Sequence, residues 1–284
     1  MNIALSIWER YPLIDFPVQP VAGPELLDGE ASLAGTVQGK VAVVSGGSTG
    51  VGRAVAKLLA ENGAQVVLLA RRAERLEAAA REMDGTVLTI PTDVSSGDSV
   101  RAAFAEVEKR FGRVDILLNS AGVARIRAIE ETQDEDIHAC VGTNLLGPIH
   151  TIRSAVPLLR AAGGGDILNI SSEITLDHMP LMSMYAASKH GLNGFTAAMR
   201  RELRGDGIRV GLVILGSIAD SAFVENFSDE DRRRAHPVWE ADGYLTRVGA
   251  AKPLTSATVA GLLYGLLTNP PEVGQDVVHI RPAG

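Results

Sequence analysis

From Lys40 onward, short apolar runs alternate with segments whose apolar residues recur at helical spacing. The nearly continuous apolar runs predict buried strands over Val41–Ser45, Gln65–Leu69, Thr86–Ile90, Val114–Leu118, Asp166–Ile170, Ile208–Ile214 and Asp276–Ile280. The helical spacing predicts helices at about Val51–Asn62, Glu74–Met83, Gly97–Phe111, Asp134–Ala162, Met184–Gly205 and Thr255–Leu267. This alternation indicates an α/β fold with a doubly wound parallel sheet, in which ligands bind beyond the carboxyl ends of the strands.

The chain has 284 residues and 46% apolar composition, enough for one large domain over residues 39–284. Residues 1–38 differ, because their prolines interrupt any helix. Since Trp8, Tyr11 and Phe16 are large apolar side chains, we expect this N-terminal extension to be an ordered arm on the domain or on a neighbouring subunit. A solvated tail is the alternative.

Charge narrows the range of partners. Lys and Arg total 27 against 34 Asp and Glu, a net charge of −7, so the composition favours a small-molecule partner over nucleic acid or an anionic membrane. The apolar stretch from Ile3 to Trp8 is too short to span a bilayer. A single cysteine, Cys140, cannot form an internal disulfide, which favours a cytoplasmic location. The six histidines show no metal-ligand spacing, and we predict no metal site.

Two motifs suggest chemistry. Gly46, Gly50 and Gly52 lie between the first predicted strand and helix, where glycines permit a tight turn and let the backbone approach a pyrophosphate. Tyr185 and Lys189 are four residues apart and share a helix face, so the ammonium is expected to lower the phenol pKa from about 10 toward working pH. Ser172, thirteen residues before Tyr185, supplies a hydroxyl that completes a carbonyl-binding pair.

Over residues 40–284 these features resemble the short-chain dehydrogenase/reductase family, whose Ser-Tyr-Lys spacing and Gly-x-x-x-Gly-x-Gly loop are both matched. The resemblance implies a seven-stranded Rossmann-type sheet and hydride transfer with a nicotinamide cofactor. It implies these catalytic residues: Asn144, Ser172, Tyr185 and Lys189. The implied cofactor-binding residues are Gly46, Ser48, Thr49, Gly50, Val51, Gly52, Arg71, Arg72, Asp93, Val94, Asn119, Ala121, Gly122, Tyr185, Lys189, Gly216 and Ile218.

Some of these residues have simpler interpretations. Asp93 could be an Asx-turn residue, and Asn144 could be a buried asparagine that satisfies local backbone groups. Ala70 stands where NAD-preferring relatives carry Asp, and Arg71 and Arg72 follow it. Because a guanidinium can bind a 2′-phosphate in bidentate fashion, we expect NADP(H); the alternative for the two arginines is a solvated charge pair.

The chain departs from the family pattern after the sixth strand, where Leu215 and Asp220 replace the usual Pro and Thr. An ionised Asp220 can accept the N–H of a nicotinamide carboxamide but cannot donate, so Ser221 is a candidate to assist. We expect the segment from Ser217 to Val248 to form a lid over the substrate. Its aromatic residues either line an apolar pocket, together with Met179, Met182 and Met184, or pack ordinarily; they are Phe223, Phe227, Trp239 and Tyr244.

Together the sequence predicts an NADP(H)-dependent oxidoreductase that interconverts a ketone or aldehyde and an alcohol, with Tyr185 as general acid and base. The alternative is an NADP(H)-binding regulatory protein without turnover. The resemblance also implies a homodimer or homotetramer formed through the helices near residues 97–162 and 184–205. Arg232, Arg233 and Arg234 could meet an anionic carrier, but the acidic residues directly before them favour a solvated helix face.

Overall fold

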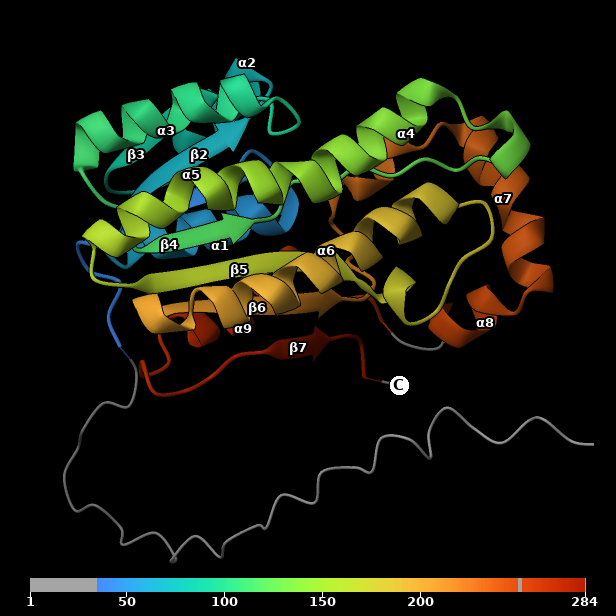
Figure 1. The fold of residues 1–284 in the computed structure, drawn as a ribbon. Coiled ribbons are helices and arrows are strands. Elements are labelled where there is room, and N and C mark those ends of the chain that lie inside the picture. The colour runs from blue at the N-terminus through green and yellow to red at the C-terminus, as the bar shows by residue number, and fades with distance from the viewer. Residues whose placement is uncertain (1–34, 250–251, 284) are drawn as a thin grey trace, which may run out of the picture. The chain divides into compact units, whose positions relative to one another are not determined.

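The computed structural model describes residues 35–249 and 252–283, and its centre is a parallel sheet of seven strands. Figure 1 shows these strands side by side in the order β3-β2-β1-β4-β5-β6-β7. Their bounds are β1 Val41–Ser45, β2 Gln65–Ala70, β3 Val87–Pro91, β4 Ile116–Asn119, β5 Gly165–Ser172, β6 Ile208–Leu215 and β7 Val277–Ile280. This confirms the predicted doubly wound parallel sheet.

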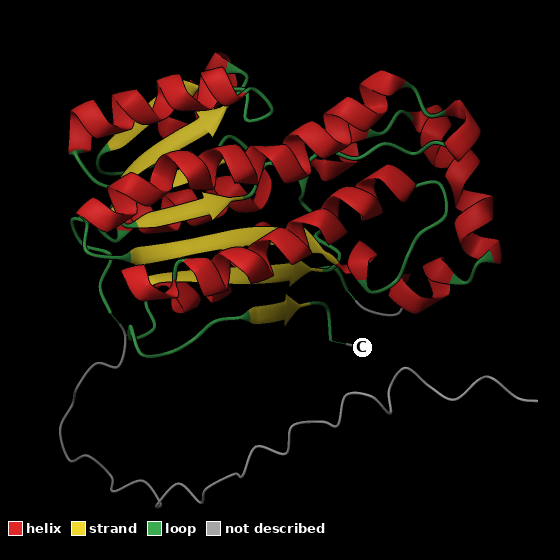
Figure 2. Ribbon diagram, in the orientation of Figure 1, coloured by secondary structure: helices red, strands yellow, loops and turns green. Residues whose placement is uncertain are grey.

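Helices cover both faces of the sheet (Figure 2) because successive strand residues point in opposite directions. Ala42 and Val44 of β1 face one apolar cluster, whereas Val43 faces the other. The first cluster is completed by helices α1 Gly50–Glu61, α2 Ala73–Ala80 and α9 Ser256–Leu267. The second is completed by α3 Gly97–Phe111, α5 Gly147–Ala161 and α6 Ser183–Glu202.

Two parts of the helix prediction need correction. The helix expected over 134–162 is α4 Asp134–Val141, a π-helical turn at Gly142–Leu146 and then α5. Helices α7 Asp229–Ala241 and α8 Tyr244–Gly249 were not among those predicted from apolar spacing. Helix α7 is mostly polar and contains Pro237, so its apolar periodicity is weak. Its capping box, formed by Ser228 and Asp231, was the readable signal.

The strand order indicates which edge of the sheet would bind a ligand. The chain runs from β1 outward to β2 and β3, then returns to β4 on the other side of β1. Ligands of such sheets bind at this reversal, beyond the carboxyl ends of the strands. Lid helices α7 and α8 lie beyond those ends in Figure 1.

The predicted arm, residues 1–38, falls mostly outside the described residues, and so do its aromatic residues Trp8, Tyr11 and Phe16. Its last part is described: the Val37 side chain is fully buried against the cluster that contains α9. The Gly35 amide also donates a hydrogen bond to the Thr268 carbonyl, 2.6 Å away. Within residues 35–249 and 252–283, no helix is both long enough and apolar enough to cross a membrane.

Candidate active site

Ser172, Tyr185 and Lys189 come together at the carboxyl edge of the sheet. Ser172 ends β5, and the two other residues occupy the first turns of α6. The Ser172 side chain lies beside the Tyr185 hydroxyl and acts to lower its pKa, and Ser172 Oγ also accepts a hydrogen bond from the Ile174 amide at 3.3 Å. Lys189 Nζ lies 5.9 Å from the centre of the Tyr185 ring and donates a hydrogen bond to the Ile170 carbonyl at 2.7 Å. The Ser-Tyr-Lys spacing predicted from the sequence therefore brings the three side chains together in one cluster.

Burial dominates the electrostatics of this cluster. Burial raises the pKa of Tyr185 to about 12, although the Ser172 side chain acts in the opposite direction. Burial also lowers the pKa of Lys189 to about 8. The expectation that Lys189 brings the phenol pKa down toward working pH is wrong for this structure, because burial of Tyr185 raises that pKa instead.

Asn144 lies in the π-helical turn, and its side chain is fully buried. Its Nδ2 donates to the Val123 carbonyl at 2.8 Å and to the Ser188 hydroxyl at 2.9 Å, while its Oδ1 accepts from the Val123 amide at 2.9 Å. A π turn displaces the residues of a helix from their usual register, and such turns recur at functional sites. Asn144 satisfies backbone groups of the loop after β4 and also contacts the residue before Lys189.

A second network of hydrogen-bonded polar side chains supports the site. Asn119 Nδ2 donates to Asn169 Oδ1 at 2.8 Å, and Asn169 Nδ2 donates to the Thr196 hydroxyl at 2.9 Å. Asn119 Oδ1 accepts from Thr151 at 2.7 Å and from Ser45 at 3.4 Å. The network thus joins β1, β4 and β5 to α5 and α6. Of these residues only Asn119 was predicted, although a lone Asn within the apolar run of β5 was a signal.

The glycine turn after β1 has the shape of a phosphate cradle. Gly46 has a φ of +70°, and a Cβ there would lie 2.7 Å from the Ala121 amide nitrogen. A Cβ on Gly52 would lie 2.5 Å from the Gly46 carbonyl oxygen. Helix α1 then begins after Thr49 with no side-chain cap, unlike α3, α7 and α9. Its first N–H groups therefore remain free for an anion, which fits a cofactor pyrophosphate.

The remaining residues predicted to bind the cofactor around this turn differ in how deeply they are buried. Ser48 and Thr49 are partly exposed beside this cradle, whereas the Val51 side chain packs into the core. Ala121 donates its N–H to the Ser45 hydroxyl at 3.5 Å. Gly122 borders the catalytic cluster, since a Cβ there would lie 3.6 Å from Asn144 Oδ1 and 3.8 Å from Lys189 Nζ.

Arg71 and Arg72 follow β2, and both are exposed. Arg72 precedes the first residue of α2, and its side chain does not cap that helix. Within the described part of the chain, no hydrogen bond or ion pair joins either guanidinium to another residue. Two unpaired guanidinium groups at a helix N-terminus fit a bound phosphate.

Asp93 and Val94 follow β3. Asp93 Oδ1 accepts hydrogen bonds from the amide and the hydroxyl of Ser95, at 3.0 and 2.7 Å, which is the Asx-turn arrangement. Val94 is buried, and its carbonyl lies 3.1 Å from His150 Nδ1. The turn organises this corner of the site and occupies one of the two carboxylate oxygens of Asp93.

The segment after β6 faces the glycine turn. Ile218 forms an isolated parallel bridge with Leu254, and Gly216 lies against Glu173, because a Cβ on Gly216 would meet the Glu173 carboxylate at 2.5 Å. Asp220 Oδ1 accepts from the Ser256 amide at 2.7 Å and from its hydroxyl at 3.0 Å. The Asp220 carboxylate, which stands where the family usually has threonine, is therefore hydrogen-bonded to the start of α9.

A cleft of about 360 Å³ lies between the glycine turn and the segment after β6. It is lined by Thr49, Gly50, Arg53, Asp220, Ser221, Ala222 and Glu225. The cleft lies directly at the uncapped start of α1, so it is the space that a cofactor pyrophosphate would enter.

Aromatic side chains of the lid cover the catalytic cluster. The Phe223 ring lies 5.2 Å from that of Tyr185, and Phe227 packs edge-on against Phe223 at 5.3 Å. Trp239 donates its indole N–H to the Pro180 carbonyl at 2.8 Å, and its ring lies 6.3 Å from that of Tyr244. Met179 and Met182 pack in the same apolar group as Tyr185. Phe223, Phe227 and Trp239 therefore pack with Tyr185 in one apolar cluster, which is the ordinary packing that the sequence left open.

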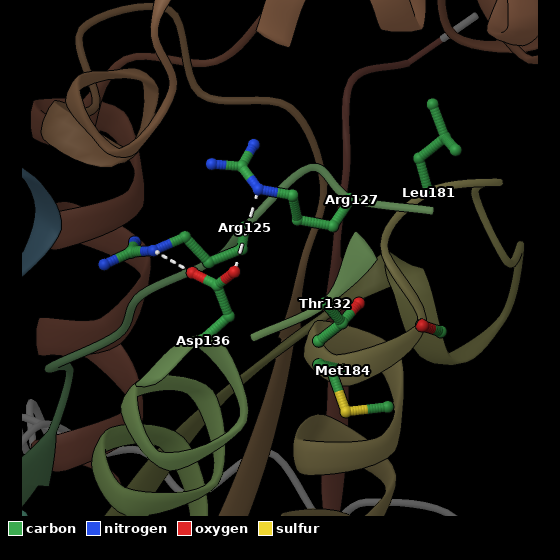
Figure 3. Close-up of a pocket in the computed structure, with 7 residues that line it drawn as sticks. Arg125, Arg127, Thr132, Asp136, Leu181 and Met184 are labelled. Atoms are coloured by element: carbon green, nitrogen blue, oxygen red, sulfur yellow. Dashed lines mark ion pairs between the residues drawn. The ribbon is translucent and has the colours of Figure 1, made fainter. Parts of the chain in front are cut away.

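An ion cluster beside the start of α6 holds the loop that follows β4 (Figure 3). Asp136 of α4 forms ion pairs with Arg125, whose Nε lies 3.2 Å away, and with Arg127, whose Nε lies 3.7 Å away. Arg127 also pairs with Asp231 of α7. Figure 3 shows the Asp136 carboxylate joined to both arginines by dashed lines, whereas Leu181 and Met184 lie away from the two guanidinium groups. This cluster fastens the lid to the loop that carries Gly122.

Comparison with known proteins agrees with this geometry. A family model described as short chain dehydrogenase matches residues 40–232. Over 197 residues the chain is 38% identical to the 3-oxoacyl-(acyl-carrier-protein) reductase of Homo sapiens, covering 69% of this chain and 81% of that protein.

Solved structures extend the match. A metagenomic short-chain oxidoreductase in complex with NADP is 30% identical, with a TM-score of 0.72 over 87% of this chain and 99% of the other. L-Sorbose reductase from Gluconobacter frateurii, complexed with NADPH and L-sorbose, is 28% identical, with a TM-score of 0.76 over 87% of this chain and 97% of the other. By sequence, fold and site, the chain belongs to the short-chain dehydrogenase family of oxidoreductases.

Proposed function

We propose that this protein is an NADP(H)-dependent oxidoreductase that interconverts a ketone or aldehyde and the corresponding alcohol. The observation that carries the proposal is the placement of the Ser172 side chain beside the Tyr185 hydroxyl, with Lys189 Nζ 5.9 Å from the centre of the tyrosine ring. Two adjacent hydroxyl groups of this kind can bind one carbonyl oxygen and transfer a proton to it.

The bound nicotinamide supplies or accepts the hydride. In the direction of reduction, the Tyr185 hydroxyl donates its proton to the carbonyl oxygen, while the Ser172 hydroxyl donates a hydrogen bond to the same atom. The phenol of Tyr185, whose pKa burial raises to about 12, is protonated at neutral pH, as an ordinary phenol also is, so the proton needed for reduction is available. Lys189 stabilises the tyrosinate left behind, and Asn144 with Ser188 holds the start of α6 in place.

The cofactor assignment rests on the end of β2. Arg71 and Arg72 offer two unpaired cations at the start of α2, and Ala70 ends β2 where an acidic residue would bind a ribose 2′-hydroxyl. A 2′-phosphate would be bound there by charge-assisted hydrogen bonds. The solved relatives that hold NADP or NADPH support the same choice.

The substrate is proposed to present an apolar group beside its carbonyl. Phe223, Phe227 and Trp239 pack around the catalytic tyrosine, and the nearby Arg125 and Arg127 are already neutralised by Asp136 and Asp231. Burial of apolar substrate surface would therefore provide more binding energy than charge pairing.

A panel of ketones with NADPH, graded in size and charge, tests the function directly. Tyr185→Phe is expected to bind NADPH normally but to turn over about 10² to 10⁴ times more slowly. Tyr264→Phe, on the partly buried α9, is the matched control and should retain activity. Near-normal turnover by Tyr185→Phe on a reduced substrate would remove Tyr185 from its assigned role.

A further inference from the structure

An ion pair joins the start of α2 to a short helix that borders the cleft. Arg75 Nη1 lies 2.9 Å from Glu225 Oε2, although the two residues are 150 positions apart in the chain. Arg75 is the third residue of α2, and Glu225 belongs to the short 3₁₀ helix η6, Ala222–Asn226, at the start of the lid. Glu225 also lines the cleft that faces the uncapped end of α1. The lid is thus fastened to the edge where the cofactor would lie.

Arg75 belongs to the same group of cations as Arg71 and Arg72. Arg72 precedes the first residue of α2, so all three arginines surround the N-terminus of this helix. Within the described residues, Arg75 has a carboxylate partner, whereas Arg71 and Arg72 have none. The Glu225 carboxylate therefore pairs with the one of these three cations that belongs to the first turn of α2.

The same short helix covers the catalytic tyrosine. The Phe223 ring lies 5.2 Å from the Tyr185 ring, and only 7% of the Tyr185 surface is exposed. A 3₁₀ helix has three residues per turn, so residues two apart, such as Phe223 and Glu225, point to different sides. Helix η6 therefore contacts Tyr185 on one side and Arg75 on the other. A shift that separates Glu225 from Arg75 would move Phe223 as well.

We propose that Arg75 is a further specificity residue for the 2′-phosphate of NADP(H), and that Glu225 occupies its place in the cofactor-free protein. Binding of the 2′-phosphate displaces Glu225, and the shift of η6 uncovers Tyr185. The inference rests on the proposed use of NADP(H). It gives the 2′-phosphate a second role, because the adenosine end of the cofactor then opens the site where the carbonyl binds.

The charges and exposures suit such an exchange. The side chains of Arg75 and Glu225 are 40% and 53% exposed, and ion pairs at that exposure are weak. A phosphate monoester offers more charge and more acceptor oxygens than a carboxylate, and it meets two further guanidinium groups at the same helix end. The exchange therefore favours the phosphate.

The test uses adenosine 2′,5′-bisphosphate, which carries the 2′-phosphate but no nicotinamide that could push Phe223 aside. Calorimetry measures its binding, and hydrogen exchange of the amides in residues 222–226 measures the shift of η6; 5′-AMP is the matched ligand. We expect the bisphosphate to bind more tightly than 5′-AMP and to speed exchange in this segment, with no acceleration by 5′-AMP.

Variants separate the steps. Glu225→Gln should show fast exchange without ligand and bind the bisphosphate about 2- to 5-fold more tightly, with 5′-AMP unchanged. Glu240→Gln removes the same charge from an exposed position of α7 and should match the parent. Arg75→Gln should weaken bisphosphate binding about 10-fold, and adding Glu225→Gln to it should change nothing further.

Two failures are distinguishable. Bisphosphate binding with unchanged exchange in residues 222–226 would overturn the coupling while leaving the cofactor assignment intact. Equal affinity for the bisphosphate and 5′-AMP would overturn both the role of Arg75 and the proposed NADP(H) preference.

Discussion

The Asn144 side chain donates a hydrogen bond to the Ser188 hydroxyl, 2.9 Å away, and Ser188 in turn donates to the Tyr185 carbonyl at 2.8 Å. Both residues are buried, and the other contacts of Asn144 are the amide and carbonyl of Val123. One amide thus joins the loop after β4 to the backbone of the proposed proton donor.

Replacing Asn144 should cost both stability and activity. Asn144→Leu leaves the Val123 N–H and C=O buried without partners, so we expect about 2 to 4 kcal/mol less stability, measured by urea unfolding. Ser188→Ala removes a single partner and should cost about 1 kcal/mol. Asn62→Ala, at an exposed helix end, serves as the control. A fully stable Asn144→Leu protein would contradict the proposed role of this amide.

Cofactor choice should depend on the arginines after β2. Arg71→Ala with Arg72→Ala is expected to reduce the preference for NADPH over NADH by about 1.5 to 3 kcal/mol, because charge-assisted bonds to the 2′-phosphate are lost. The ratio of kcat/KM for the two cofactors measures this change. Arg81→Ala, a charge removal just after α2, is the control. Equal or better use of NADH by the unmutated protein would be incompatible with the assignment.

Lys189 should make stability depend on pH. Its pKa is about 8 in the folded chain against 10.5 for an ordinary lysine side chain, so the unfolded chain binds more protons between these values. The free energy of unfolding should therefore rise with pH across that window, by up to about 3 kcal/mol, and this group adds no further change below pH 8. Unfolding of the parent and of Lys189→Met at pH 7 and pH 10 isolates the effect. A constant difference between the two proteins would show that Lys189 is not desolvated.

The lid should depend on Arg247. Its guanidinium binds Asp177 through two hydrogen bonds, at 2.8 and 3.0 Å, and Asp242 at 2.9 Å. Lysine cannot form this fork, so Arg247→Lys should raise KM for the carbonyl substrate about 3- to 10-fold. Global stability should fall by less than about 1 kcal/mol, because the side chain is 46% exposed. Arg101→Lys, on α3, is the control, and an unchanged KM would separate the lid from substrate binding.

The features that the sequence predicted are those with local signals. Strand β1 is a continuous apolar run with its predicted bounds, and the i, i+4 spacing of Tyr185 and Lys189 holds in any helix. The π turn was hidden within a long apolar helical pattern, because apolar spacing does not report hydrogen-bond register. Helix α7 was missed because its face is polar, although Ser228 signalled its start.

Long-range contacts account for the rest. The raised pKa of Tyr185 reflects desolvation to which Phe223 of the lid contributes, 38 residues later in the chain, so local spacing could not reveal it. The pair formed by Arg75 and Glu225 depends on how η6 meets α2. Asp220 looked free to bind a carboxamide until the start of α9 was seen to occupy one of its oxygens.

The contacts of the lid point to an evolutionary consequence. Arg127, Arg247 and Trp239 fasten it through polar contacts near the surface, whereas the chain from Ser45 through Asn119 to Thr196 lies beneath the sheet edge and includes no lid residue. The match to the family model also ends at residue 232, inside α7. Substitutions near Phe223 would change the burial of Tyr185, whereas substitutions in residues 229–249 would leave that polar chain intact. We therefore expect that exchanging this segment between relatives changes the range of substrates while the hydrogen-bonded chain from Ser45 to Thr196 stays the same.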